Sequence, residues 1–335
     1  MVTKYAKKNI CGNSHKVDKI NDGNFDIFFY TVGWESRFTE ILNHLGSSFK
    51  SEQNFVCSFE QEGESGYSTE KKSKFIENLN ARIGANVDSL KFEYSEFKTF
   101  EDKIDHIINS TLKGQNRPLK IGFEISSCPR YYFLYFLSLC IFKNYTNNLS
   151  FFYSEGEYPN ITEDESFFNS FGTTTKIIQY SGLAEKEGRT VLVFSLGFES
   201  NFIIDKINKK DPSHVIFLCA KPGYTRKYED KVEKEINRIV TFCELPDDMY
   251  TLKYATAGDA IIAWQELEKN IVDVEGAHII NYVIGTKPHC IAMTLNGLIN
   301  DNIVVKYRIA KKYNKRDVKS NGEYWRYDIT NLSVI

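Results

Sequence analysis

The chain has 335 residues, more than a single hydrophobic core usually fills, and 42% hydrophobic with 26% charged residues is typical of a globular protein. A formal net charge of −2 excludes a chain-wide basic field that would attract nucleic acid or an anionic membrane. The seven cysteines show no disulfide or zinc pattern, and the longest apolar run, 131–142, is too short to span a bilayer. We therefore expect a cytoplasmic protein of two domains, without a metal, a cofactor, a membrane contact or direct binding to nucleic acid.

Apolar runs alternate with amphipathic segments from residue 25 onward, after a polar and basic stretch, 1–24, that is expected to form an N-terminal arm. Strands are predicted at 26–31, 54–59, 89–94, 119–125 and 149–153. The segments between and after them predict helices at 37–45, 69–83, 99–112 and from residue 130 onward. This pattern indicates five strands, four of them followed by helices.

The same order of elements returns in the second half of the chain. The segment DIFFYTVGWESRF at 26–38 is similar to VLVFSLGFESNF at 191–202, and Gly33 and Gly197 are 197 − 33 = 164 residues apart. Further matches stay collinear while the offset shrinks, to 288 − 129 = 159 at the two prolines that follow the fourth strands. An internal duplication is therefore predicted, with copy one at 25–160, a connector with one short strand (176–180) at 161–189, copy two at 190–314 and a C-terminal tail at 315–335.

Continuous apolar strands alternating with helices predict parallel sheets that are covered on both faces. The predicted fold is α/β, with two tandem Rossmann-like domains, each doubly wound around a mainly parallel five-stranded sheet. Ligands of such folds bind beyond the carboxyl ends of the strands, where the strand order reverses. The loops after strands one and four are expected to flank that point.

Those loops carry the candidate ligand-binding residues, which are Gly33, Trp34, Glu35, Ser36, Arg37, Ser127 and Arg130 in copy one and Gly197, Glu199, Ser200, Gly285, Thr286, Lys287 and His289 in copy two. Ser36, Ser127, Ser200 and Thr286 also suit the start of a helix, so helix initiation alone would explain much of both motifs. It does not explain the cationic side chains. Arg37, Arg130 and Lys287 beside helix N-termini are a combination that favours a phosphate or another anion, with His289 orienting it and backbone N–H groups around the glycines as donors.

Glu35 and Glu199 occupy the same place in the repeat and are the candidate catalytic residues, as an acid and a base. A carboxylate in the first turn of a helix is also favoured by the helix dipole, so a structural role is the alternative. No dinucleotide fingerprint, nucleophile elbow or metalloprotease motif is present.

The strand-one loops and the Gly-Thr-Lys loop at 285–287 give the chain a resemblance to a known group. Rossmann-like halves with these loops resemble the CARF sensor domains of CRISPR-associated proteins, and two halves in one chain resemble the SAVED domains of cyclic-nucleotide antiviral systems. The resemblance implies recognition of a cyclic oligonucleotide across the cleft between the halves, with a separate effector or partner protein.

Three functions follow as hypotheses. The first is a sensor or regulatory subunit that binds a nucleotide-type anionic ligand at a cleft between the two halves, in antiviral defence. The second is a nucleotide-processing enzyme, a nucleosidase, nucleotide hydrolase or phosphoribosyltransferase-like protein, that uses Glu35 or Glu199. The third is a structural docking subunit of a larger complex.

Overall fold

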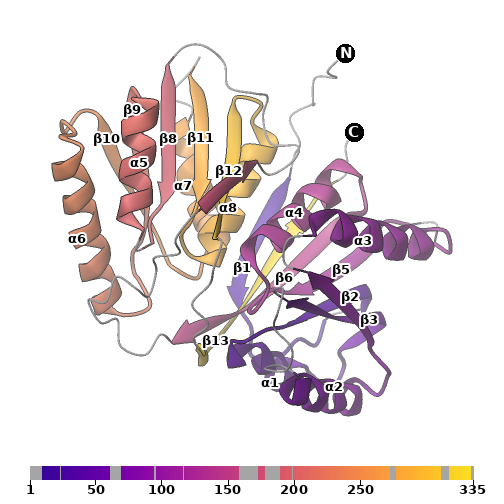
Figure 1. Cartoon of the computed structure of the whole chain (residues 1–335). Helices are drawn as coiled ribbons and strands as arrows, with labels where there is room; N and C mark the ends of the chain where they lie inside the picture. Colours follow the sequence, from indigo (N-terminus) through magenta and orange to yellow (C-terminus); the bar gives the residue numbers. More distant parts are fainter. Residues whose placement is uncertain are drawn as a thin grey trace. The chain divides into compact units, whose positions relative to one another are not determined.

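The computed structural model describes residues 10–22, 24–60, 69–93, 96–115, 117–157, 173–177, 189–197, 199–271, 277–310 and 317–332. They form two compact units, each with its own sheet and core (Figure 1). The described residues within Lys8–Ile161 and Lys315–Ile335 form the copy-one unit, and those within Thr162–Asn314 form the copy-two unit.

The copy-one unit has a sheet in the order β1-β13-β6-β5-β2-β3-β4. Its strands are β1 (Cys11–Lys16), β2 (Asn24–Val32), β3 (Lys50–Glu60), β4 (Asp88–Glu93), β5 (Leu119–Glu124), β6 (Thr146–Glu157) and β13 (Lys319–Thr330). The helical segments are η1 (Ser36–Glu40), α1 (Ile41–His44), α2 (Thr69–Ile83), α3 (Phe97–Leu112) and α4 (Arg130–Phe142). The run from β6 to β4 is parallel, whereas β13 and β1 are antiparallel to their neighbours.

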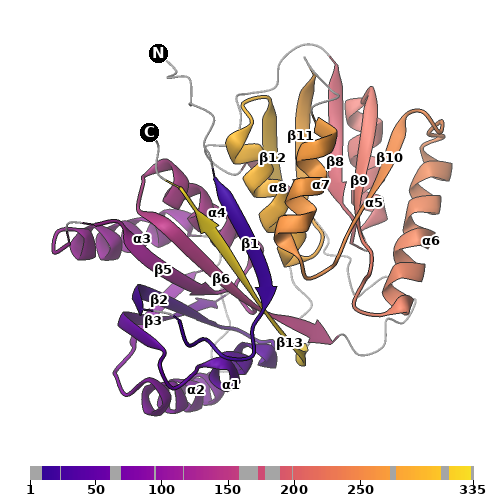
Figure 2. The ribbon, with the colours of Figure 1, turned by 180° about the vertical axis from the view of Figure 1, so that it is seen from behind.

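The copy-two unit has a sheet in the order β10-β9-β8-β11-β12-β7. Its strands are β7 (Thr173–Ile177), β8 (Thr190–Ser195), β9 (His214–Ala220), β10 (Tyr250–Ala255), β11 (His278–Val283) and β12 (Ile303–Ala310). All pairs are parallel except that of β7 with β12. Figure 1 shows α5 (Ser200–Lys210) and α6 (Arg226–Phe242) in front of this sheet, and Figure 2, from behind, shows α7 (Ala260–Ile271) and α8 (Lys287–Ile299) on the opposite face.

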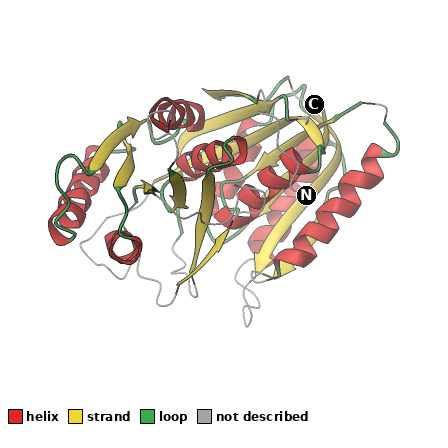
Figure 3. Cartoon of the chain, turned by 90° about the horizontal axis from the view of Figure 1, so that it is seen from above, coloured by secondary structure: helices red, strands yellow, loops and turns green. Residues whose placement is uncertain are grey.

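The parallel strands of each unit, numbered within their own copy, lie in the order 3-2-1-4-5. The predicted Rossmann-like α/β fold is therefore confirmed, and Figure 3 shows from above how the helices lie along the sheets. In this order strands two and three lie on one side of strand one, and strands four and five lie on the other side. The strand order therefore reverses between strands one and four. The reversal points are between β2 and β5 and between β8 and β11. The predicted cleft shared by both halves concerns the two units together and stays a prediction.

The two ends of the chain differ from the expected arm and tail. β1 and β13 add two antiparallel strands to the copy-one sheet, with β13 between β1 and β6. The predicted helix at 37–45 is a 3-10 helix followed by one short α-turn. The predicted strand at 176–180 overlaps β7 at Thr173–Ile177, and its residues 178–180 lie outside the described residues.

Side-chain packing explains why the helices lie where they do. In α6 the buried residues Val232, Ile236 and Ile239 form one stripe, which faces the copy-two core. In contrast, α4 is buried along nearly its whole length and is apolar on all sides, as expected for a helix inside a domain. Among the described residues, no helix is both long and apolar enough to cross a membrane.

Candidate functional site

The loops after strands one and four lie side by side in each unit. In the copy-one unit a Cβ atom on Gly33 would lie 3.1 Å from the Ser127 Cβ, and the Ser127 hydroxyl donates to the Glu35 carbonyl over 3.0 Å. In the copy-two unit a Cβ atom on Gly197 would lie 3.5 Å from the Ile284 carbonyl oxygen and 3.8 Å from the Gly285 Cα. The structure thus brings together, within each unit, the two loops that the sequence singled out.

A buried hydroxyl at the end of strand one bonds to the end of strand four in the copy-one unit and to the strand-four loop in the copy-two unit. Thr31 donates to the backbone carbonyl and to Oε2 of Glu124, each over 3.0 Å. At the matching position, 164 residues later, the Ser195 hydroxyl accepts from the Gly285 N–H over 2.8 Å. These contacts fix the spacing between strands one and four at their carboxyl ends.

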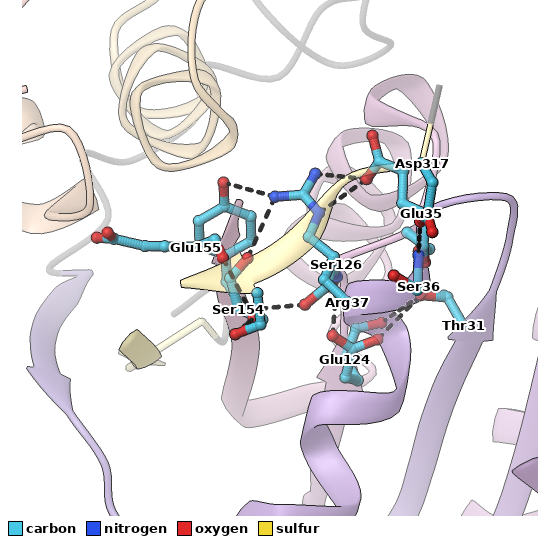
Figure 4. Close-up of polar contacts among 12 residues, drawn as sticks. Thr31, Glu35, Ser36, Arg37, Glu124, Ser126, Ser154, Glu155 and Asp317 are labelled. Carbon is cyan, nitrogen blue, oxygen red and sulfur yellow. Dashed lines mark hydrogen bonds and ion pairs between the residues drawn. The ribbon is translucent and has the colours of Figure 1, made fainter. Parts of the chain in front are cut away.

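Arg37 is at the centre of the copy-one loops, with a side chain that is only 2% exposed (Figure 4). Its Nε donates to Glu35 Oε2 over 2.8 Å, and its Nη2 donates to the same oxygen. Its Nη1 donates to the Tyr153 hydroxyl over 3.1 Å and to the Ser154 carbonyl over 3.2 Å. The guanidinium also lies 5.3 Å from the centre of the Tyr153 ring. The prediction that Arg37 presents its charge to a ligand is therefore not supported, because Nε, Nη1 and Nη2 all donate hydrogen bonds to groups of the protein itself.

The copy-two unit places an arginine beside the corresponding glutamate, but from a different position in the chain. Glu199 forms an ion pair with Arg308 of β12, and the Arg308 guanidinium lies 5.2 Å from the Phe202 ring centre. The residue that matches Arg37 in the repeat is Asn201.

The registers of the two sheets match Arg308 with Ser154. Ile27, Ile121 and Leu149 lie side by side across β2, β5 and β6, as Val191, Ile279 and Ile303 do across β8, β11 and β12. Ser154 and Arg308 each follow five residues later, since 154 − 149 and 308 − 303 are both 5. Each unit therefore has an arginine beside its strand-one glutamate. The segment after strand one supplies it in copy one, and the fifth strand supplies it in copy two.

This arrangement favours a structural role for Glu35 and Glu199. Each carboxylate faces a guanidinium of its own unit, at side-chain exposures of 18% and 20%. A carboxylate whose oxygen is bonded to a guanidinium of its own unit suits a loop anchor better than a group that exchanges protons with a substrate.

The helix starts show which part of each motif is a cap. Thr286 is the N-cap of α8 and its hydroxyl accepts from the His289 N–H, with proline in the first turn, as predicted. The other helices start differently: Glu35, Glu199 and Pro129 are the N-caps of η1, α5 and α4, and none of them makes a side-chain cap bond. Ser36 and Ser200 lie at helix starts as expected, as the first residues of η1 and α5, but they are not the N-caps; Ser127 lies before Pro129, the N-cap of α4.

The remaining predicted residues differ in exposure. Trp34 is half-buried in the turn after β2, and Arg130 is half-buried in the first turn of α4. Ser200 is buried at the start of α5, and Lys287, the first residue of α8, is 8% exposed. Of the predicted cationic residues, Arg130 and Lys287 stay at helix starts next to the strand-four loops.

His289 is fully buried and its ring faces the loop after β10. The ring Nε2 lies 3.1 Å from the Thr256 carbonyl oxygen, which can only accept, so Nε2 carries the proton. Burial disfavours the charged ring and lowers its pKa from 6.5 to about 4. His289 is neutral at physiological pH and fully buried against the Thr256 carbonyl, so the predicted role of orienting an anion does not fit it.

His289 is expected to contribute to the pH dependence of stability. Below pH 6.5 the unfolded chain binds a proton on this ring, whereas the folded chain does not until the pH approaches about 4, so stability falls as the pH falls through this window. Between pH 7 and pH 4.5 the expected loss from this one group is about 2 kcal/mol. Chemical denaturation of the wild type and of His289→Gln at both pH values measures it. Equal losses in the two proteins would show that the ring is not a buried neutral group.

Three residues that hold these loops were not predicted: Asp317, Arg308 and Ser154. Asp317 lies in the segment that has no partner in the repeat, and its carboxylate accepts from the Ser36 N–H. Ser154 directly follows the predicted strand 149–153, and Arg308 lies at the equivalent place in copy two, outside the motifs that were predicted to form the site. Copy two has Asn201 where copy one has Arg37, and this difference is the sequence signal that Glu199 pairs with an arginine from elsewhere in the chain.

Comparisons with known proteins add little to this geometry. No family model and no curated protein matches the chain. The crystal structure of a functionally unknown protein from Pseudomonas aeruginosa PAO1 is similar at 10% identity and a TM-score of 0.24, covering 84% of this chain and 92% of that one. The adenylation, ketoreductase and pseudo Asub multidomain structure of a keto acid-selecting NRPS module is similar at 10% identity and a TM-score of 0.20, covering 84% of this chain and 28% of that one. At these TM-scores neither match bears on function.

Proposed function

We propose that this protein binds a nucleotide-type anionic ligand at the loops that follow strands one and four. The observation that carries the proposal is the strand order of both sheets, which puts these two loops on either side of the reversal point. In open α/β sheets ligands bind at this place, beyond the carboxyl ends of the strands.

The loop at the start of α8 supplies the chemistry that an anion needs. This helix has 13 residues and begins directly after β11, so the positive end of its dipole and its first N–H groups lie at the carboxyl edge. Lys287 adds a positive charge in the first turn. The Glu199 carboxylate of the strand-one loop is paired with Arg308.

The role that we propose is that of a sensor or regulatory subunit in antiviral defence, with a separate effector or partner protein. It rests on the resemblance of the duplicated Rossmann-like halves and the Gly285-Thr286-Lys287 loop to CARF and SAVED domains. In such a role the ligand is a cyclic oligonucleotide, and binding is the signal that passes to the partner.

Isothermal titration calorimetry against cyclic tri-adenylate, ATP, NAD and inorganic phosphate tests the binding. We expect one of the nucleotides to bind and Lys287→Ala to weaken it at least about tenfold, the cost of one charge-assisted contact. Lys269→Ala is the matched control, because this lysine of the same unit is 68% exposed and paired with Glu266. The absence of binding to every compound, or equal affinity in Lys287→Ala, would contradict the proposal.

A further inference from the structure

The C-terminal segment reaches the strand-one loop of the copy-one unit. The Asp317 carboxylate accepts from the Ser36 N–H, and the Arg37 N–H donates to the Val318 carbonyl over 3.2 Å. Both residues open η1, directly after the strand-one glycine turn. Two backbone donors of this loop are thus used by the protein's own chain.

The same segment continues as β13 and is held along its length. β13 pairs with β6 on one side and with β1 on the other. Where it meets the loop the packing is close, because a Cβ atom on Gly156 of β6 would lie 2.5 Å from Val318 Cγ1 and 2.9 Å from Arg37 Nη1. Only glycine fits between the segment and Arg37 without a shift of either neighbour.

The strand-one loop of the copy-two unit differs at the matching position. Ser200 takes the place of Ser36, and among the residues that the structure describes no side chain accepts from its N–H. The arginine of this unit comes from β12 and pairs with Glu199. Within the described residues, the two copies therefore share a fold but differ in the contacts of their strand-one loops.

We propose that residues 317–330 act as an intramolecular strap that closes the strand-one loop of the copy-one unit, and that the ligand binds to the copy-two unit alone. The second half of this inference rests on the proposed function. An anion at the copy-one loop would have to displace the Asp317 carboxylate from Ser36 and take donors from Arg37, whose guanidinium is already bonded to Glu35, Tyr153 and Ser154. In the copy-one unit the strand-one loop thus supports the C-terminal strand instead of binding a ligand.

Hydrogen exchange without any ligand tests the strap. In Asp317→Ala the amides of Ser36 and Arg37 are expected to exchange at least about tenfold faster than in the wild type, because local opening becomes easier. Asp88→Ala is the control, since Asp88 lies exposed on β4 of the same unit. Unchanged exchange at Ser36 and Arg37 would overturn the strap.

Calorimetry with cyclic tri-adenylate tests the assignment to one unit. We expect one equivalent per chain, at least about tenfold weaker binding in Lys287→Ala and less than about a twofold change in Arg130→Ala. Two equivalents per chain, or equal losses in the two variants, would overturn it. If this compound and the others of the panel do not bind, the proposed function fails, and the exchange experiment alone decides whether the strap exists.

Discussion

Replacing Arg37 by asparagine is expected to destabilise the copy-one unit by about 3 kcal/mol. Removing one partner of a buried ion pair costs about 3–5 kcal/mol because the other charge is left uncompensated. The lower value applies here, since the Glu35 side chain keeps 18% exposure to water. The variant also removes the donors to Tyr153 and to the Ser154 carbonyl. Chemical denaturation followed by near-ultraviolet circular dichroism measures the change.

Adding Ser154→Arg to Arg37→Asn is expected to restore about half of the lost stability. The double substitution gives copy one the residues that copy two has at these positions, Asn201 and Arg308, and the new guanidinium can reach Glu35 as Arg308 reaches Glu199. Recovery is partial, because Ser154 is fully buried and its hydroxyl donates to Ser320.

Arg82→Asn serves as the control for this pair of variants. Arg82 is an exposed arginine of the same unit whose Nη2 donates to the Leu45 carbonyl, so its loss is expected to cost less than about 1 kcal/mol. A double variant that is less stable than Arg37→Asn alone would show that Ser154 and Arg308 do not occupy equivalent places.

Ending the chain after residue 316 is expected to prevent the copy-one unit from folding. This truncation removes β13, the strand between β1 and β6, with the buried side chains of Tyr324, Tyr327 and Ile329. Burying large apolar side chains contributes about 1.5–3 kcal/mol each, so the loss is comparable with the whole stability of a domain, about 5–15 kcal/mol. Hydrogen exchange is expected to show fast-exchanging amides in β1 and β6.

A chain that ends after residue 332 keeps all of β13 and is the matched control. Its amides in β1 and β6 are expected to exchange as slowly as those of the full chain. If the shorter truncation also kept these amides protected, the C-terminal strand would be an addition to the sheet and not part of its core.

The sequence predicted the parallel part of both sheets because those strands carry local signals. The runs before Gly33 and Gly197 are mainly apolar, and the glycine, the polar residues and the amphipathic segment that follow mark the turn into a helix. Because the pattern recurs in both halves of the chain, the matching loops were expected at equivalent ends of two equivalent sheets.

The ends of the chain were missed for the opposite reason. β1 reads CGNSHK and is mostly exposed, and β13 begins with the polar run KSNGE, so neither resembles a buried strand. Their pairing joins residues about 300 positions apart, as between Cys11 and Thr330, and no local pattern can reveal it.

The same limit applies to the cationic residues of the loops. Arg37 looks available for a ligand from its neighbours in sequence, yet its partner Tyr153 lies 116 residues further along the chain. His289 looks like a titratable residue at a helix start, yet the loop at Thr256 buries it. Which charge remains for a ligand is decided by tertiary contacts.

Hydrogen exchange of the full chain with and without cyclic tri-adenylate tests the central claim most directly. We predict that the ligand slows exchange at residues 199–202 and 284–290, the loops after strands one and four of the copy-two unit, and leaves Ser36 and Arg37 unchanged. Slower exchange confined to other parts of the chain, with no change at these loops, would contradict the account.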